Sequence, residues 1–469
     1  MKVRIALPKG RLLSPTSALL ERTGWGLSGY TREARLYRLT SRRFPKLEAR
    51  MLHERDIPVQ VAVGNYDLGI CGRDWVEELL VKYPSIDLVE VRNLGYGAGS
   101  LYLAASRYDA ATSLEGIQAR PAAVRMVSEY ANLAESYALN LRLRRFTVSP
   151  LWGAAEVYPP ENADLALVAG KSREEVLSGG LQPVDKVLDF SAFLIANKRS
   201  WETRDLSEVL ASLGNGASEM VEEPAPMAPI PPALREETDD FLWLALPDGH
   251  QQQHTVRLLN QAGIKMEDYP SPRGNRRPGS SLEGVRIKVI RPQDMPLQVA
   301  NGNFDLAVTG RDWLREHLYQ FPSSPVVELL NLGLGRVRLV AVVSQELPIS
   351  DTEGLREMSM NRETPLRVCS EYIHIADRYA CDNHLGRYRV IPTWGASEAF
   401  VPEDADLLIE NTETGGTIAR HGLKIIDTLF ESTACLISNR NTLGSPGKAE
   451  RIEGITGTLR KAVEQDTRA

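Results

Sequence analysis

The stretch DLGICGRDW, residues 67–75, returns later in the chain as DLAVTGRDW at residues 305–313. Two tripeptides further along also return: Ser128–Tyr130 as Ser370–Tyr372, and Trp152–Ala154 as Trp394–Ala396. The offset is 238 residues for the first stretch (305 − 67) and 242 for the tripeptides (370 − 128, 394 − 152), so the copies are nearly collinear. Solenoid repeats recur every ~20–50 residues. The sequence therefore predicts the duplication of a whole domain.

The 469-residue chain accommodates two such units of roughly 200 residues each, enough for a sizeable core and two lobes apiece. Between them, residues 222–232 read EEPAPMAPIPP. Proline at this density blocks helix and central strand, which indicates an extended linker. We expect a first repeat at residues 1–215, a Pro-rich acidic linker at 216–237 and a second repeat at 238–469.

Both copies alternate short apolar runs with amphipathic stretches. The strand candidates are Val3–Leu7, Tyr66–Ile70, Phe193–Ile195 and Cys435–Ile437, and the helical patterns include Ser14–Thr23 and a helix from Trp75. Strands separated by helices favour an α/β fold with a mainly parallel core. After Asn441 the second copy offers only a loop and one helix, so we expect no further C-terminal domain.

Composition narrows the function classes. The formal net charge is −6, which does not favour a general nucleic-acid-binding surface. No apolar run approaches the ~18 residues of a membrane span, and the first residues lack the apolar core of a signal peptide. The four cysteines form no CxxC pair, which argues against a disulfide framework or a zinc site. We expect a cytoplasmic protein without membrane or nucleic-acid partners.

A candidate phosphate-binding loop lies in the second copy. A buried strand from Asp406 runs into the turn Thr414–Thr417, sequence TGGT, and a helix is expected from Ile418. Backbone N–H groups at such a turn bind phosphate, because Gly415 and Gly416 carry no side chain to block approach. The hydroxyls of Thr414 and Thr417 add donors, while Glu410 and Glu413 suit ribose hydroxyls or a bridging Mg²⁺. On this segment alone, an ordinary Thr/Gly helix cap explains the pattern equally well.

The first copy has lost this loop. At the same 242-residue offset the strand persists, but Arg173, Glu174 and Glu175 replace Gly415, Gly416 and Thr417. Carboxylates and bulky side chains then occupy the anion cradle. We expect no phosphate binding at this position of the first copy.

The basic turn shows the opposite loss. The first copy reads LPKGRL at residues 7–12, where Gly10 permits close backbone approach and Lys9 and Arg11 can grip a polyphosphate. The second copy reads LPDGHQ at residues 246–251, which inverts the local charge. A Lys-Gly-Arg turn is more often solvated surface than a site, but its loss in one copy only favours the functional interpretation.

Together these segments resemble ATP phosphoribosyltransferase, the enzyme family of the first step of histidine biosynthesis. The resembling segments are Leu7–Leu12, Asp56–Pro58, Asp294–Pro296, the two stretches at 67–75 and 305–313, Asn331–Gly335 and Glu413–Thr417. The resemblance implies two tandem copies of a two-lobed α/β unit similar to a type II periplasmic binding protein, each with its site in the cleft. It also implies Mg²⁺ as cofactor, with ATP and phosphoribosyl pyrophosphate (PRPP) as substrates.

The chain resembles two short-form units of this family fused head to tail. Short forms rely on a partner similar to histidyl-tRNA synthetase, so the resemblance implies such a regulatory subunit. No residue is assigned as a metal ligand.

The reciprocal losses lead to a hypothesis about one site. If basic turn and phosphate loop had to come from the same copy, neither copy would hold a complete set. If they come from different copies, Lys9 and Arg11 act as catalytic residues beside a PRPP-binding segment made of Glu410 and Glu413–Thr417. We therefore expect the halves to form a pseudo-symmetric intramolecular dimer, with higher oligomers left open.

Other residues are weaker candidates. Arg73 and Arg311, in the repeated GRDW motif, are candidate ATP contacts together with Gly10, whereas Asp and Trp of the motif suit a helix cap and core packing. Further phosphate candidates are Arg32, Arg35 and Arg291, and the scattered His374, His384 and His421 are interpreted as surface or packing residues.

Two other functions stay open. A cleft of this kind in a decayed duplicate also fits a non-catalytic regulatory subunit that binds a nucleotide or an amino acid, although an intact Glu413–Thr417 loop argues against it. A phosphoribosyltransferase acting on a free base would have a similar loop after paired acids, but would not explain the basic turn or the GRDW motifs.

Overall fold

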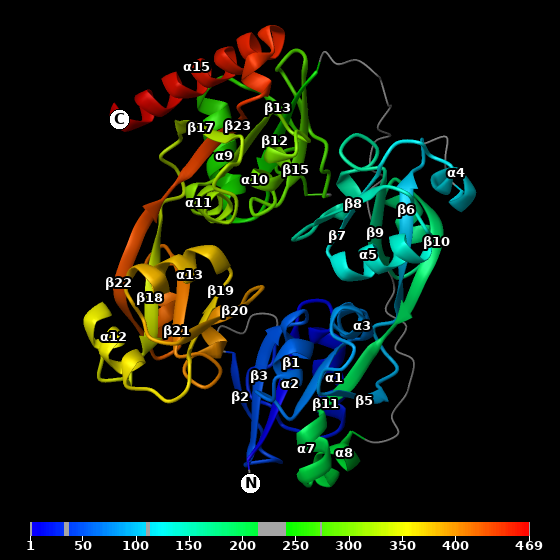
Figure 1. Cartoon of the computed structure of the whole chain (residues 1–469), viewed down its shortest axis with the longest axis vertical. Helices are drawn as coiled ribbons and strands as arrows, with labels where there is room; N and C mark the ends of the chain where they lie inside the picture. The colour runs from blue at the N-terminus through cyan, green and yellow to red at the C-terminus, as the bar shows by residue number, and fades with distance from the viewer. Residues whose placement is uncertain (1, 32–36, 109–112, 214–240, 273, 469) are drawn as a thin grey trace.

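The computed structural model describes residues 2–31, 37–108, 113–213, 241–272 and 274–468. The expected linker at 216–237, and the candidates Arg32 and Arg35, lie outside the described residues. Four α/β lobes surround the centre of the molecule in Figure 1, two from each repeat. We call them lobes 1A (residues 2–93 and 192–213), 1B (99–190), 2A (241–331 and 434–468) and 2B (337–432).

The two A lobes share one sheet plan. In lobe 1A the strand order is β2-β3-β1-β4-β11-β5, and in lobe 2A it is β15-β12-β16-β23-β17. The strands of lobe 1A are β1 Val3–Lys9, β2 Arg38–Thr40, β3 Leu47–His53, β4 Leu68–Gly72, β5 Leu88–Asn93 and β11 Ala192–Asn197. Those of lobe 2A are β12 Leu242–Pro247, β15 Val285–Ile290, β16 Leu306–Gly310, β17 Val326–Asn331 and β23 Ala434–Asn439.

The two B lobes also match each other, with strand orders β10-β6-β9-β7-β8 and β20-β19-β21-β18-β22. The strands of lobe 1B are β6 Gly99–Ser106, β7 Val124–Ser128, β8 Phe146–Pro150, β9 Leu165–Gly170 and β10 Leu181–Phe190. Those of lobe 2B are β18 Val337–Ser344, β19 Leu366–Ser370, β20 Tyr388–Pro392, β21 Leu407–Thr412 and β22 Leu423–Ser432. Each unit is thus two-lobed α/β, as predicted.

The expected mainly parallel core is only partly right. In lobe 1A, β1 pairs in parallel with β3 and β4, but β11 is antiparallel to both β4 and β5. The reason is the path of the chain, which leaves the A lobe after β5, builds the B lobe and returns through β10 into β11. A strand that returns from the other lobe enters the sheet from the opposite end.

Helices cover the sheets where the apolar periodicity places them. The main ones are α1 Leu13–Arg22, α2 Asp56–Ala62, α3 Arg73–Lys82 and α5 Ala131–Asn140 in the first repeat, and α9 His250–Gln261, α10 Met295–Ala300, α11 Arg311–Gln320 and α13 Ile373–Asp382 in the second. Trp75 and Trp313 stack on Tyr130 and Tyr372, each with ring centroids 4.3 Å apart. The packing interpretation of the GRDW tryptophans is therefore right.

The predicted C-terminal helix is α15, Pro446–Arg468, whose Ile452, Ile455 and Leu459 are buried in the core of lobe 2A. The first repeat has two short helices, α7 Lys198–Thr203 and α8 Ser207–Ser212, at the corresponding place in its sequence.

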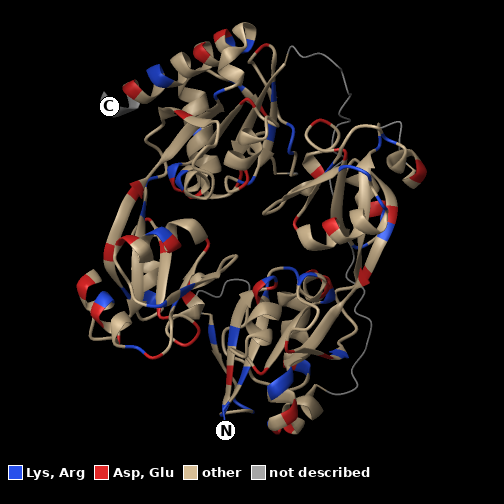
Figure 2. Cartoon of the chain, in the orientation of Figure 1, with Lys and Arg blue, Asp and Glu red and all other residues tan. Residues whose placement is uncertain are grey.

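The two repeats pack reciprocally, with each A lobe on the B lobe of the other repeat. One continuous apolar core joins Tyr66 and Ile57 of lobe 1A to Phe400 and Val401 of lobe 2B. A second joins Tyr158 and its neighbours in lobe 1B to lobe 2A, where Phe304 and Met295 contribute. Each A lobe therefore rests on the B lobe of the other repeat (Figure 1). Lys/Arg and Asp/Glu are interspersed over all four lobes (Figure 2).

Candidate functional site

The Glu413–Thr417 loop connects β21 to the short helix α14, Gly416–Arg420. Gly415 has φ +78°, a left-handed conformation in which a side chain would be strained. Its N–H donates to Oγ1 of Thr412 (2.9 Å), and the N–H of Gly416 donates to Oγ1 of Thr414 (3.4 Å). The helix begins at Gly416 rather than Ile418, since the glycine turn itself starts the first helical turn.

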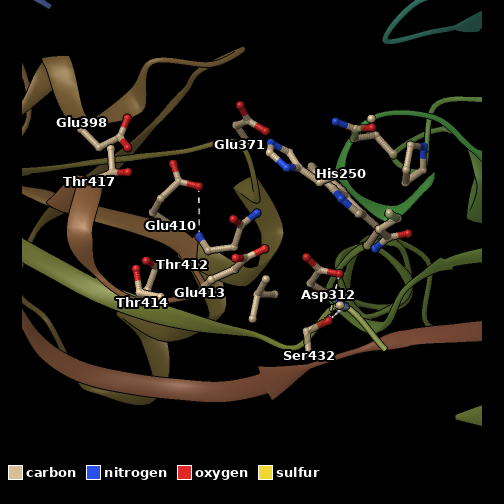
Figure 3. Close-up of a pocket in the computed structure, with 18 of the residues that line it drawn as sticks. His250, Asp312, Glu371, Glu398, Glu410, Thr412, Glu413, Thr414, Thr417 and Ser432 are labelled. Carbon is tan, nitrogen blue, oxygen red and sulfur yellow. Dashed lines mark hydrogen bonds between the residues drawn. The ribbon is translucent and has the colours of Figure 1, made fainter. Parts of the chain in front are cut away.

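This loop opens onto a cavity of about 670 Å³ between lobes 2A and 2B. From lobe 2B the lining includes Glu371, Glu398, Glu410, Glu413, Thr414, Gly416 and Thr417, and from lobe 2A it includes Asp248, Gly249, His250, Gln251, His254, Arg291 and Asp312. Figure 3 shows Thr417, Thr414 and the glutamates on one side, with His250 and Asp312 opposite. The volume is in the range of small-molecule sites.

Three carboxylates of lobe 2B interact inside the cavity. Burial, followed by the negative charge of Glu398, raises the pKa of Glu371 to about 7. Burial also raises the pKa of Glu410 well above its ordinary value, followed by repulsion from Glu371 and Glu398. Glu410 accepts a hydrogen bond from the N–H of Asn411 (3.0 Å). A ligand that brings hydroxyl donors or a cation is favoured here, because burial of neighbouring carboxylates disfavours their charged forms.

The first repeat contributes to this same cavity. Tyr37, directly before β2, lines it and lies against His421 with ring centroids 5.0 Å apart. Nζ of Lys9 donates to the Tyr37 hydroxyl (3.0 Å) and lies 4.7 Å from the ring centroid. The charge of Lys9 acts across the repeats to lower the pKa of Glu371. Lys9 is thus linked to the cavity through Tyr37, although Lys9 is not itself among the residues that line it.

Arg11 is bound within the first repeat. Its guanidinium binds Glu54 (Nε–Oε2 2.9 Å) and Asp74 (Nη2–Oδ2 2.6 Å), and lies 4.7 Å from the ring centroid of Phe190. All these partners belong to the first repeat. In this structure Arg11 does not reach the Glu413–Thr417 loop, contrary to expectation, because Glu54 and the fully buried Asp74 hold its guanidinium. Gly10, between Lys9 and Arg11, has φ +112°, which permits this turn.

The lost loop of the first repeat is occupied by its own side chain. Helix α6, Arg173–Ser178, starts at the equivalent position, and Ser172 Oγ accepts from the N–H of Glu175 (3.3 Å). The carboxylate of Glu175 in turn accepts from the backbone N–H of Lys171. This reciprocal arrangement is a form of capping box. The first repeat thus has a side-chain helix cap at this position, where the protein supplies its own anion.

The acidic turn of the second repeat is likewise neutralised. Asp248 Oδ2 pairs with Arg276 (2.6 Å) and with Arg291 (3.3 Å). The candidate Arg291 lines the cavity. His250, which also lines it, occupies the position equivalent to Arg11 of the first repeat.

Arg73 and Arg311 lie elsewhere. Arg73 pairs with Glu77 (3.1 Å) and Glu90 (3.3 Å), and Arg311 pairs with Glu328 (3.0 Å). Neither arginine lines the described cavity. Their role as ATP contacts has no support in this geometry.

The sequence interpretation missed Tyr37, Glu371 and Glu398. Glu371 belongs to the repeated SEY tripeptide and Glu398 follows the repeated WGA tripeptide, so a signal for both was present. Tyr37 lies outside every repeated segment quoted above, and its place emerges only from the packing of one repeat on the other.

A sequence-family model described as ATP phosphoribosyltransferase matches residues 53–215 and 291–461, more than half of the chain and one segment in each repeat. The chain belongs to the ATP phosphoribosyltransferase family. Among the curated relatives, the ATP phosphoribosyltransferase of Geotalea daltonii is 33% identical over 230 residues, covering 48% of this chain and 73% of the relative. ATP phosphoribosyltransferase 1 of Geobacter sulfurreducens is 32% identical over 233 residues, covering 48% and 73%.

Two solved structures are similar to half of the chain. A chain of the ATP phosphoribosyl transferase (HisG:HisZ) complex from Thermotoga maritima is 21% identical with a TM-score of 0.39, covering 48% of this chain and 100% of that chain. The periplasmic aliphatic sulphonate binding protein SsuA from Escherichia coli is 15% identical with a TM-score of 0.30, covering 49% and 71%.

Two further findings concern the described residues only. None of their helices is both long and apolar enough to cross a bilayer. No group of three or more His, Cys, Asp or Glu side chains among them is arranged to hold a metal ion.

Proposed function

We propose that this chain transfers the phosphoribosyl group of PRPP to N1 of ATP, releasing pyrophosphate, in the first step of histidine biosynthesis. Membership of the family supports the reaction. The observation that carries the choice of site is the intact Glu413–Thr417 loop, which opens onto a cavity bordered by Tyr37 of the other repeat. We also propose the division into a repeat at 1–215, a linker at 216–237 and a repeat at 238–469.

In the proposed reaction, N1 of the adenine ring forms a bond to the anomeric carbon of PRPP as the bond from that carbon to the pyrophosphate oxygen breaks. By analogy with glycoside hydrolysis, positive charge develops on the ribose ring and negative charge on the leaving group. Correct placement of the two reactants supplies a large part of the rate enhancement.

The residues of the cavity divide these tasks. The turn Thr414–Thr417 holds the 5′-phosphate through backbone N–H groups and hydroxyls. Glu410 and Glu413 accept hydrogen bonds from the ribose hydroxyls. Lys9, reaching across from the first repeat, offers positive charge to the pyrophosphate. Arg11, held by Glu54 and Asp74, stabilises the first repeat instead.

The Mg²⁺ implied by the family fits this site only as an ion carried by substrate. The described residues provide no ready-made metal cluster, whereas Mg²⁺ commonly binds through substrate phosphates and one or two carboxylates. Glu410 and Glu413 are the carboxylates beside the loop that suit this task. The ion would neutralise charge on the pyrophosphate.

We further propose a cytoplasmic location and regulation by a partner similar to histidyl-tRNA synthetase. The family resemblance supports both. Co-purification of such a partner with the tagged chain, and a change in its turnover on addition of that partner, would test the second proposal.

The test of the function is pyrophosphate release by the purified chain with Mg²⁺, PRPP and ATP, compared with the same mixture lacking ATP. Release that depends on ATP, with an adduct absorbing in the near ultraviolet, supports the proposal. Replacing ATP with free adenine separates it from a free-base transferase. Binding of PRPP or ATP without release, even after a partner is added, would favour a regulatory subunit.

A further inference from the structure

Both interfaces between the repeats contain an equivalent arginine–glutamate pair. At the 1A–2B interface, Nη2 of Arg38 donates to Oε2 of Glu403 (3.0 Å). At the 2A–1B interface, the equivalent Arg277 donates to Oε2 of Glu161 (3.1 Å). Since these pairs are the same in both places, they would fit a pairing of like repeats as well as the pairing seen here.

A second part of the 1A–2B interface is specific to it. Asp404, with none of its surface exposed, accepts from Nη2 of Arg4 (2.6 Å) at one oxygen and from the hydroxyl of Tyr66 (2.7 Å) at the other. Both donors come from the first repeat and the carboxylate from the second. Removing the partners of such a buried charge is strongly destabilising.

The equivalent positions of the 2A–1B interface are Trp243, Phe304 and Asn162. Trp243 and Phe304 follow from the strand register, in which Ile5 pairs with Leu68 as Leu244 pairs with Leu306. Asn162 follows from the 242-residue offset between the later parts of the repeats (404 − 242).

Asn162 uses both ends of its amide across the 2A–1B interface. Its Nδ2 donates to the backbone carbonyl of Asn303 (2.5 Å), and its Oδ1 accepts from Nζ of Lys288 (2.5 Å). Lys288 is fully buried and lies 5.0 Å from the centroid of Trp243. An amide is required here because one end must donate and the other must accept.

Pairing like repeats would break both arrangements. In a second–second pair, Asp404 would take the place of Asn162, so one of its oxygens would meet Nζ of Lys288 and the other would face the carbonyl of Asn303. That second contact places two acceptors together without a proton, and the carboxylate would lose both Arg4 and Tyr66. In a first–first pair, Arg4 would meet the neutral amide of Asn162 on a surface already rich in arginine. A buried acceptor without a donor and a like-charge contact both disfavour wrong partners.

We propose that the Arg4–Tyr66–Asp404 set, opposed to the Trp243–Phe304–Asn162 set, makes each repeat selective for the unlike repeat. The partner that these surfaces fit is therefore the other half of this chain and never a second copy of the same half. This selectivity ensures that Tyr37 of a first repeat always borders the loop of a second repeat.

The test removes the difference between the interfaces. A protease site is placed in the linker of the full chain, the protein is cut, and both halves are unfolded and refolded together. Native mass spectrometry then counts like and unlike pairs. Wild type should yield unlike pairs, and Arg4→Trp/Tyr66→Phe/Asp404→Asn should shift the population towards the statistical mixture. Like pairs in wild type, or only unlike pairs in the triple variant, would overturn the proposal.

Asp406→Asn provides the matched control, since this carboxylate binds Arg367 (3.0 Å) within lobe 2B. It should weaken the lobe without changing the pairing.

A second measurement needs no cutting. In the intact chain, the midpoint of chemical unfolding is compared for Tyr66→Phe, Asp404→Asn and the double variant. The proposal expects the double variant to lose little more than Asp404→Asn alone, because the hydroxyl acts through this carboxylate. Fully additive losses would contradict it.

Discussion

The phosphate-loop and basic-turn positions of the first repeat and their counterparts in the second repeat differ in what balances their charges. In the first, Arg11 is held by Glu54 and Asp74, and the carboxylate of Glu175 caps the backbone where a phosphate would bind. In the second, the Glu413–Thr417 loop stays open to the cavity. The first position carries its own carboxylate, and the second is open to a ligand.

The comparison shows that residues that replace a lost binding loop can stabilise the fold. The residues that replace the phosphate loop in the first repeat form a helix cap, and Arg11 of its basic turn is held in ion pairs with Glu54 and Asp74. Lys9, which donates to Tyr37 at the border of the cavity, is available to the neighbouring repeat. This comparison can be broken or sharpened by moving residues between the repeats.

The largest effect is expected from copying the decayed loop into the intact one. Gly416→Glu/Thr417→Glu puts two carboxylates in the phosphate cradle, so pyrophosphate release should fall ~10³-fold, as for loss of an essential anion donor. A steady-state assay measures it. The reciprocal change in the first repeat, Glu174→Gly/Glu175→Thr, should leave the rate within about twofold. A comparable loss in both variants would mean that both loops work.

Lys9→Ala should come next. Losing the cross-repeat cation should lower kcat/KM by ~10²-fold, and Lys9→Arg should recover part of it, because the positive charge is retained. Initial rates over a range of PRPP concentrations provide the measurement. Unchanged kcat/KM in Lys9→Ala would remove this residue from the reaction.

Arg11→Ala should affect stability more than chemistry. It leaves the buried Glu54 and Asp74 without their guanidinium, at a cost of about 1–2 kcal/mol once the exposed part of Arg11 is allowed for. Urea unfolding measures the loss, and turnover of the folded fraction should change little. A stable but inactive Arg11→Ala protein would restore the arginine to the catalytic site.

The pH dependence should reveal the carboxylate cluster. Burial raises the pKa of Glu371 to about 7, so the group becomes charged in the folded protein as the pH rises through 7. PRPP affinity should then fall, because negative charge builds up beside an anionic ligand. Folding stability should fall as the pH rises from about 4.5, the ordinary pKa of a glutamate, to about 7. Over this range the unfolded protein has lost the proton of Glu371 and the folded protein still holds it.

Binding titrations of PRPP at several pH values test this, with Glu371→Gln as the comparison. The variant should show a flatter profile across neutral pH. An identical profile in both proteins would assign the titration to another group.

The smallest effect is expected at the GRDW arginines. Arg73→Ala and Arg311→Ala each remove partly exposed ion pairs that contribute ~0–1 kcal/mol. Activity should stay within about twofold of wild type. A large rise in the KM for ATP in either variant would return that arginine to the nucleotide site.

The sequence alone indicated the duplication, the α/β class, the packing role of the GRDW tryptophans and the loop that differs between the copies. These depend on local pattern and on comparing one copy with the other. The direction of Arg11 could not be obtained in this way, because it depends on Glu54 and Phe190, which are distant in sequence.

Cross-repeat contacts were also beyond local pattern. Tyr37 reaches the cavity only because lobe 1A rests on lobe 2B. Glu371 stood in a repeated tripeptide, but its altered pKa is a product of burial and of its neighbour Glu398, which only the folded chain provides.

The central claim is that one site per chain, built from both repeats, binds PRPP. Calorimetric titration of the full chain with PRPP and Mg²⁺ counts these sites directly. The account predicts a single site per chain that is lost in Gly416→Glu/Thr417→Glu and kept in Glu174→Gly/Glu175→Thr. Two equivalent sites per chain, or one that survives the first pair of substitutions, would contradict it.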